Sequence, residues 1–392
     1  MKRFGILTFV SLLVLGVFFI THFLRSDTAA QEVNSQAAVD SIVENILSRR
    51  SEDYQTGEVD FGDEKQINIL LIGLDSRKEG EVEEAHCDAI HMLTLDIENW
   101  NIKITSVPRG TYSWIPNGPY AATDYYLANA CAFAGLDYGV SQIENIVGVK
   151  ADYVVTVGFS QTMGILRLFD LPATESLQWL RHRQSYQIGD PQRSHNQAVF
   201  IKDMIVNHLD KFRSFFGTPM QYLIYTLMDT DMDFATAKTL LDGYMEAEID
   251  TRPDDIVLQM KPWYATQDLH FDPENAQEQI QALIDFVAPY LSEADLSRMT
   301  TADMQVIVVD YIEQALALDE SLEDVVYHEL WLQIEDDNVR EDLQYKILEK
   351  YVLELSDGDA IDMISDYILE KETLGLDDWA QKGKDLLASV LG

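Results

Sequence analysis

Basic residues are scarce in this chain of 392 residues. It has 28 Lys and Arg against 67 Asp and Glu, which gives a formal net charge of −39 at pH 7. A surface this anionic repels phosphate backbones, so nucleic acid is not expected as a partner outside a local basic site. Hydrophobic residues nevertheless make up 47% of the chain, and a sequence of this length and composition can bury at least one large core.

Cysteine is nearly absent, with Cys87 and Cys131 as its only occurrences. Outside a membrane, the two residues can form a disulfide, which for a loop of this size stabilises the fold by about 4 kcal/mol. Two free buried thiols are the alternative, because cysteine is among the most frequently buried residues. The sequence does not separate these two states.

Long apolar runs are also rare, and the longest covers residues 4–24 without a charge. A bilayer is spanned by about 20 apolar residues, and the preceding Lys2 and Arg3 place the N-terminus in the cytoplasm. A cleaved signal peptide is the rival interpretation, but its apolar region normally has about 7–15 residues. No cysteine follows the run, which excludes a lipoprotein anchor. We therefore expect residues 1–25 to form a cytoplasmic tip and a single transmembrane helix, with the bulk of the protein outside the cell membrane.

The pattern of the next segments predicts an α/β domain on a stalk. Residues 26–65 are polar and acidic, which is typical of a stalk, although a short amphipathic stretch lies around Val39–Leu47. Residues 66–268 alternate between apolar strand-like runs and helical spacing, so we expect an α/β/α layered sandwich. The predicted strands are Ile67–Gly73, Ala89–Asp96, Ile102–Val107, Asp152–Phe159 and Ile256–Met260.

Residues 269–392 have a different character. From Phe271 onward there are 30 acidic and 7 basic residues, which is more than half of the net negative charge of the protein. The apolar positions keep helical spacing throughout, and no hairpin rich in Gly or Pro interrupts them. This indicates an all-α acidic domain, whose partner the sequence does not name.

The predicted hairpin brings charged residues together. Asn99 and Asn101 flank a turn, so the second and third strands pair antiparallel and Arg109 lies beside Asp88. If the first strand pairs antiparallel with the second, Asp75 reaches the same edge. Two carboxylates suit Mg²⁺, which takes oxygen ligands. In the alternative interpretation, Asp75 only forms a turn and Asp88 only starts a strand.

Three arginines fall within thirteen positions of this anionic chain, namely Arg181, Arg183 and Arg193. Guanidinium groups bind phosphate or carboxylate through a rigid fork of donors, so we expect an anion site. Asp190 and Pro191 look like an N-cap followed by Pro at the first helical position. Arg193 then lies in the first helical turn, where the helix dipole also favours an anion. Alternatively, these arginines are surface partners of the abundant carboxylates.

A series of short motifs follows the apolar run in a set order. They are Asp75-Ser-Arg77, Asp88, Val107-Pro-Arg109, Leu180-Arg-His-Arg183, Gly189-Asp190-x-x-Arg193 and Gln197. This order resembles that of the LytR-CpsA-Psr (LCP) family over roughly residues 66–265. The resemblance implies an LCP-like fold and a cell-wall ligase for polymers such as teichoic acid or capsule. Such an enzyme transfers a glycopolymer from a polyprenyl-pyrophosphate carrier to peptidoglycan as a phosphodiester.

The resemblance also implies roles for individual residues. Asp75 and Asp88 would hold Mg²⁺ on the pyrophosphate, Asp190 would orient arginines, and Gln197 would help to bind phosphate. An apolar pocket between the sheet and its helices would take the lipid chain. The arginines that would bind the pyrophosphate oxygens and stabilise the charge of the transition state are Arg77, Arg109, Arg181, Arg183 and Arg193.

Four segments depart from the pattern of the family. The family usually has Arg-Ser-Asp-Thr at residues 86–89, where this chain reads His-Cys-Asp-Ala. Gly110 stands where a carboxylate near the nucleophile is expected, and Asn196 stands where an arginine is expected. A Gly-Gly-Val segment and hairpin that help to wall the site are shortened to residues 169–172.

Two function classes follow from these observations. The first is a membrane-anchored phosphotransferase of envelope glycopolymer assembly, which the aspartates and arginines favour. The second is a non-catalytic relative that binds polyprenyl phosphate or glycopolymer and organises envelope enzymes, which Gly110 and Asn196 favour. A purely structural acidic surface protein would leave the arginine cluster unexplained.

Overall fold

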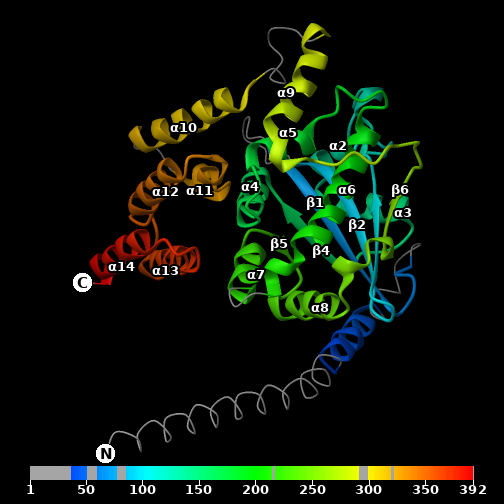
Figure 1. The fold of residues 1–392 in the computed structure, drawn as a ribbon, viewed down its shortest axis with the longest axis horizontal. Helices are drawn as coiled ribbons and strands as arrows, with labels where there is room; N and C mark the ends of the chain where they lie inside the picture. Colours follow the sequence, from blue (N-terminus) through cyan, green and yellow to red (C-terminus); the bar gives the residue numbers. More distant parts are fainter. Residues whose placement is uncertain are drawn as a thin grey trace, which may run out of the picture.

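The computed structural model describes residues 37–50, 60–76, 85–213, 217–290, 299–318 and 322–391. Its centre is a six-stranded mixed sheet in the order β5-β4-β1-β2-β3-β6 (Figure 1). β2 pairs antiparallel with both β1 and β3, whereas β4 runs parallel to β1 and β6 runs parallel to β3. The strands are β1 (Gln66–Ser76), β2 (Ala85–Asp96), β3 (Asn101–Ser106), β4 (Tyr153–Val157), β5 (Asp229–Thr230) and β6 (Ile256–Met260).

The five strands expected from the sequence are confirmed, and so is the antiparallel hairpin of β2 and β3. β1 is buried on both faces, with Ile67 in one core and Leu70 and Ile72 in another. This explains why its sequence is a continuous apolar run rather than an alternating one. β5 was not expected, because two residues are too few to show a pattern.

Helices lie on both faces of the sheet, as the layered arrangement requires. On one face, Leu127 and Ile143 pack with Leu70 of β1. On the opposite face, Ala198 and Leu240 pack with strand residues in a second core. The helices that carry these residues are α2 (Leu127–Ala134), α3 (Leu136–Val147), α6 (Asp190–His208) and α8 (Phe234–Glu246).

From α9 onward, the regular elements that the structure describes are all helical, as the acidic C-terminal sequence predicts. α9 packs on the α/β part through Ile280, which shares a core with Trp179 and Phe271. The later helices have cores of their own, around Trp331 and Ile364. The remaining helices are α4 (Phe159–Leu168), α5 (Ala173–Arg181), α7 (Gly217–Thr226), α9 (Ala276–Val287), α10 (Thr301–Ala317), α11 (Glu323–Tyr327), α12 (Asp337–Tyr351), α13 (Asp357–Thr373) and α14 (Asp377–Leu391).

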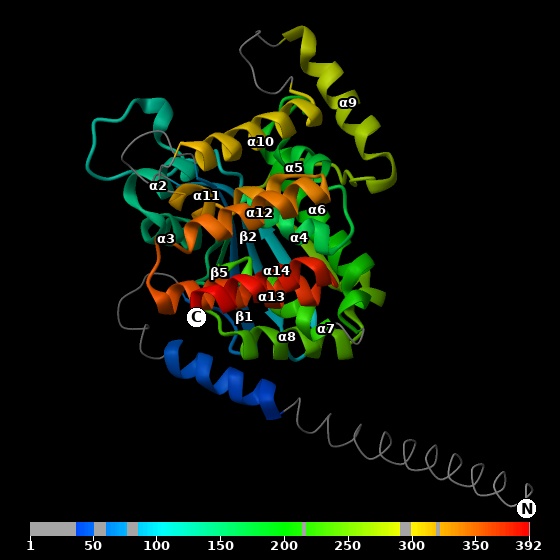
Figure 2. The ribbon, with the colours of Figure 1, turned by 90° about the vertical axis from the view of Figure 1, so that its left-hand side faces the viewer.

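The C-terminal helices are docked against α4 and α5. Figure 2 shows them in orange and red on the side of the molecule that faces the viewer. The short helical turn Leu330–Gln333 lies against α4, where Gln333 Nε2 donates a hydrogen bond of 2.7 Å to Ser160 Oγ. Arg167 of α4 donates to the backbone oxygen of Leu332. Polar contacts therefore fix the acidic helices on the side of α4.

The segment before β1 is partly helical. Residues 37–50, within the expected stalk, form a helix whose Ile46 is buried in the core of the sheet. Arg50 of this helix makes two hydrogen bonds to Asp152, at 2.7 and 2.6 Å. Among the residues that the structure describes, no helix is both long and apolar enough to cross a bilayer. The apolar run 4–24, on which the transmembrane prediction rests, lies outside those residues.

Candidate functional site

Asp88 occupies an irregular position in the sheet. β1 and β2 pair regularly up to Gly73 opposite Ala89, and the next pair is Leu74 opposite Cys87. Asp88 is therefore the extra residue of a β-bulge and has no partner in the ladder. A bulge redirects a side chain, and bulges are over-represented next to active sites.

Arg109 is the ion-pair partner of Asp88. It follows β3, and its Nη1 forms an ion pair with Asp88 Oδ1. Its Nε also lies 4.0 Å from Asp190 Oδ1. Burial opposes the charge of Arg109, but Asp88, Asp190 and Tyr126 together outweigh it, so the pKa of Arg109 lies above its usual value. The expected meeting of Asp88 and Arg109 at one edge of the sheet is confirmed.

Asp190 joins the same cluster, as the first residue of α6 rather than as its N-cap. The N-cap of α6 is Gly189, which has a φ of 59°, and α6 itself begins at Asp190. The prediction of Asp190 as the N-cap was therefore wrong, because glycine can adopt the left-handed conformation used here. The carboxylate instead pairs with Arg193 and accepts a hydrogen bond of 3.2 Å from the backbone N–H of Gly110.

Arg193 lies deepest in the cluster, with 5% of its surface exposed. Its Nη2 donates 3.3 Å to the backbone oxygen of Asp88, so it joins α6 to the bulge. Burial lowers the pKa of Arg193, and Asp190 only partly offsets this. Among the residues that the structure describes, its Nε has no hydrogen-bond partner. A buried guanidinium that is incompletely compensated favours the binding of a further anion.

The other two arginines of the predicted anion site are exposed. Arg181 is the last residue of α5, and its guanidinium lies 4.2 Å from the ring centroid of Phe159. Arg183 follows the end of α5, and its charge contributes to the lowered pKa of Arg193. The structure thus brings Arg183 towards the cluster and directs Arg181 over Phe159.

Gln197 and His91 lie next to Arg193, on the buried side of the cluster. Gln197 Nε2 donates 2.9 Å to the backbone oxygen of Leu180 and so holds the end of α5. His91 is fully buried and its Nδ1 lies 3.1 Å from Ser106 Oγ. Burial lowers the pKa of His91 to about 4, so its ring is neutral at pH 7. The sequence analysis missed His91, whose only signal was a polar residue inside the apolar run Ala89–Asp96.

Asp75 lies at the same edge as the cluster. It is opposite His86 in the pairing of β1 with β2, and 4% of its surface is exposed. The antiparallel pairing on which its placement depended is confirmed. Within the described ranges, no three His, Cys, Asp or Glu side chains are grouped to hold a cation. Arg77 lies outside the described residues.

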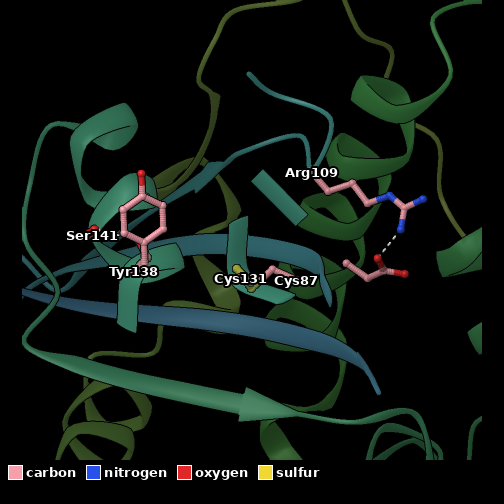
Figure 3. The surroundings of a disulfide bond; sticks show 6 residues. Cys87, Arg109, Cys131, Tyr138 and Ser141 are labelled. Atoms are coloured by element: carbon pink, nitrogen blue, oxygen red, sulfur yellow. Dashed lines mark hydrogen bonds and ion pairs between the residues drawn. A yellow bond between two sulfur atoms is a disulfide. The ribbon is translucent and has the colours of Figure 1, made fainter. Parts of the chain in front are cut away.

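A disulfide lies directly next to the bulge. Cys87 and Cys131 are bonded, which settles the alternative that the sequence left open. Figure 3 shows the disulfide with Arg109 on one side and Tyr138 on the other. Because Cys87 precedes Asp88 directly, the bond fixes α2 to the strand that carries the bulge.

Comparison with known proteins shows similarity to one family. Residues 23–164 match the model of the LytR_cpsA_psr family. The polyisoprenyl-teichoic acid–peptidoglycan teichoic acid transferase TagU of Bacillus cereus is 29% identical over 118 residues, which are 30% of this chain and 37% of TagU. The corresponding transferase TagT of Bacillus subtilis is 31% identical over 114 residues, which are 29% of this chain and 32% of TagT. The chain thus spans about a third of the length of these two curated relatives.

Among solved structures, TagV of Bacillus subtilis is similar at 16% sequence identity and a TM-score of 0.41. The match covers 57% of this chain and 98% of TagV. By the match to the family model and the curated relatives, this chain is similar to the LytR-CpsA-Psr family over residues 23–164.

Proposed function

We propose that this protein transfers a glycopolymer from a polyprenyl-pyrophosphate carrier to peptidoglycan, outside the membrane and as a phosphodiester. The observation that carries the proposal is the cluster of Asp88, Arg109, Asp190 and Arg193, which three separate segments bring to one edge of the sheet. The names of the relatives, which are teichoic acid transferases, support a transferase of this class. The apolar run 4–24 would anchor the protein as a single-pass membrane protein, with its N-terminus in the cytoplasm.

In this proposal the chain acts mainly by positioning and charge stabilisation. An acceptor hydroxyl attacks the phosphorus attached to the glycopolymer, and the bond to polyprenyl phosphate breaks. Arg109 and Arg193 bind the phosphate oxygens, and Arg183 adds charge from the rim. Asp88 and Asp190 hold both guanidinium groups in place before the substrate arrives. Such fixed donors stabilise the charge of the transition state with little reorganisation.

In this proposal, Mg²⁺ would be held between the protein and the substrate. Asp75 and Asp88 would supply carboxylate oxygens, and Mg²⁺ typically takes one or two carboxylates together with substrate phosphates and waters. When bound, the ion would neutralise negative charge on the pyrophosphate.

A second candidate function is a non-catalytic scaffold that binds polyprenyl phosphate or glycopolymer. One specific observation favours it. Gly110 carries no side chain at the position facing Asp190 Oδ2, where the resemblance to the LytR-CpsA-Psr family implies a carboxylate. A protein of this kind would keep the anion site formed by Arg109 and Arg193 but lack a group to accept the proton of the acceptor hydroxyl.

The decisive experiment measures release of polyprenyl phosphate by the full-length protein in detergent, with a polyprenyl-pyrophosphate glycan and peptidoglycan. We expect release that depends on Mg²⁺, and Arg109→Ala should lower its rate roughly 100-fold. Asp75→Ala should raise the Mg²⁺ concentration that is required. Arg213→Ala is the matched control, because this arginine pairs with Asp250, outside the cluster.

Tight carrier binding without release, even with acceptor present, would establish the scaffold instead. Neither binding nor release would contradict both functions. Release that Arg109→Ala leaves unchanged would mean that the cluster is not the site.

A further inference from the structure

The loop between β3 and α2 exposes two large aromatic side chains. Tyr112 is 69% exposed and Trp114 is 59% exposed, whereas Ser113 and Ile115 between and after them are buried. Tyr112 also forms an isolated bridge with Tyr126, so the segment is extended there. Because residues two apart in an extended segment point the same way, Tyr112 and Trp114 present their rings on one side.

The ring of Trp114 is held rigidly although it is exposed. It stacks on Tyr125 with ring centroids 5.2 Å apart and planes inclined by 23°. The hydroxyl of Tyr138 donates 2.8 Å to the backbone oxygen of Trp114. An exposed aromatic ring that is already ordered loses little conformational entropy when a ligand binds to it.

The same loop is fixed to the candidate site. The backbone N–H of Leu127 donates 2.9 Å to Thr111 O, and that of Ala128 donates 3.1 Å to Arg109 O. Leu127 and Ala128 are the first two residues of α2. The disulfide of Cys131 joins this helix to Cys87, the residue before Asp88. Trp114 lies five positions after Arg109, so their Cα atoms are within roughly 17 Å of each other.

The composition of the loop indicates the kind of ligand that would bind there. From Gly110 to Thr123 there is no charged residue, in a chain of which 24% is charged. The exposed side chains of this segment are aromatic or small, and none is a long aliphatic one. A lipid chain would be expected to contact aliphatic groups, and a phosphate would be expected to contact cations. An aromatic face bordered by hydroxyl and amide groups suits an uncharged ring with apolar C–H groups on one face and hydroxyls at its edge, which is a sugar.

We propose that Trp114 and Tyr112 form a saccharide-binding platform, on which a sugar ring stacks next to the phosphate-binding cluster. This inference rests on the proposed function, because it assigns the sugar of either the donor glycopolymer or the peptidoglycan acceptor to this loop. Tyr125 supports the platform from behind and does not itself contact the sugar.

The test measures saccharide binding to the full-length protein in detergent by isothermal titration calorimetry. One arm uses a peptidoglycan tetrasaccharide and the other uses lipid-free teichoic acid, so that acceptor and donor are distinguished. Trp114→Ala should weaken binding in one arm roughly tenfold, as loss of one stacking contact does for nucleobases. Trp114→Phe should restore most of the affinity, and Tyr112→Ala should have a smaller effect. Tyr327→Ala, which removes an aromatic side chain that is 71% exposed on α11, is the matched control.

Each outcome separates the platform from the proposed transfer reaction. Unchanged affinity of Trp114→Ala in both arms, or no saccharide binding by the wild type, overturns the platform even if polyprenyl phosphate is released. Weakened binding of a glycan-free polyprenyl phosphate, with saccharide binding intact, overturns it as well. Saccharide binding that depends on Trp114 without any release would uphold the platform and contradict the transfer reaction.

Discussion

Glu335 of the C-terminal region accepts a hydrogen bond of 2.7 Å from the backbone N–H of Thr174, 161 residues earlier in the chain. Thr174 lies in the first turn of α5, the helix that ends at Arg181. The N-cap of this helix, Pro172, provides no side-chain acceptor, so the acidic region supplies one. Glu335 also lies 3.6 Å from Arg167 of α4. One carboxylate thus connects the C-terminal helices to two helices of the α/β domain.

Glu335→Ala should therefore destabilise the junction. We expect the free energy of unfolding to fall by about 1–2 kcal/mol, because α5 loses a charged cap and Arg167 loses its counter-charge. Thermal unfolding and hydrogen exchange of α5 would measure this. Asp378→Ala is the control, since Asp378 is an exposed carboxylate in the first turn of α14. Equal effects of the two changes would contradict the capping role of Glu335.

The buried ion pair between Arg50 and Asp152 leads to a second prediction. Arg50 and Asp152 are both almost fully buried, and Asp152 also accepts 2.8 Å from the backbone N–H of Asn68 in β1. Removing one partner leaves the other charge buried, so Arg50→Ala should cost about 3–5 kcal/mol. Chemical denaturation measures this cost, and limited proteolysis should show earlier cleavage near residues 37–50.

Arg49→Ala provides the comparison, because Arg49 only lies over the ring of Tyr153, 4.5 Å from its centroid. It should cost about 1 kcal/mol or less. If Arg50→Ala were no more costly than Arg49→Ala, the helix over residues 37–50 would not be part of the folded domain.

These contacts show where sequence reasoning succeeds and where it stops. The hairpin of β2 and β3 has a local turn signal, so the meeting of Asp88 and Arg109 was predictable. The bulge that turns Asp88 towards Arg109 depends on the pairing with β1 and leaves no local signal. The cap that Glu335 places on α5 joins segments 161 residues apart, and no pattern of spacing encodes it. The position of Asp190 within α6 was wrong by one residue, since Gly189 takes the cap with a positive φ.

Glu329 should make stability depend on pH. Burial raises its pKa from 4.5 to about 7, and the charges of Glu370 and Asp229 act in the same direction. A carboxyl whose pKa is higher in the folded state binds more protons there, so its contribution to stability decreases as pH rises from about 4.5 to about 7. Glu329→Gln has no carboxyl at this position, so it does not lose stability in this way as pH rises. The free energy of unfolding of the variant should exceed that of the wild type by roughly 2–3 kcal/mol at pH 8, and the two should converge near pH 4.

The quantity to compare at each pH is the difference in the free energy of unfolding between Glu329→Gln and the wild type. Burial lowers the pKa values of His91 and His182 to about 4, so both residues make the folded protein more stable as pH rises. In the wild type, this opposes the decrease in stability that Glu329 causes. Glu354→Gln, at an exposed position, should show no such dependence. A constant difference between Glu329→Gln and the wild type from pH 4 to 8 would rule out titration of Glu329 in this range.

Gly110→Asp should raise the rate of transfer if the protein is an enzyme. A Cβ built at Gly110 lies 3.7 Å from Asp190 Oδ2, which is an ordinary contact, so a side chain fits. A carboxylate at position 110 would place a proton acceptor next to Arg109. We expect release of polyprenyl phosphate to accelerate roughly tenfold or more, with a shift in its pH profile.

Gly110→Asn is the matched control, because it has the same shape but accepts no proton at neutral pH. It should leave the rate at or below that of the wild type while filling the same space beside Asp190. If Gly110→Asp and Gly110→Asn behave alike and both remain folded, a missing proton acceptor does not limit the reaction. The acceptor hydroxyl would then lose its proton to another group, of which Asp190 itself is the nearest to Gly110.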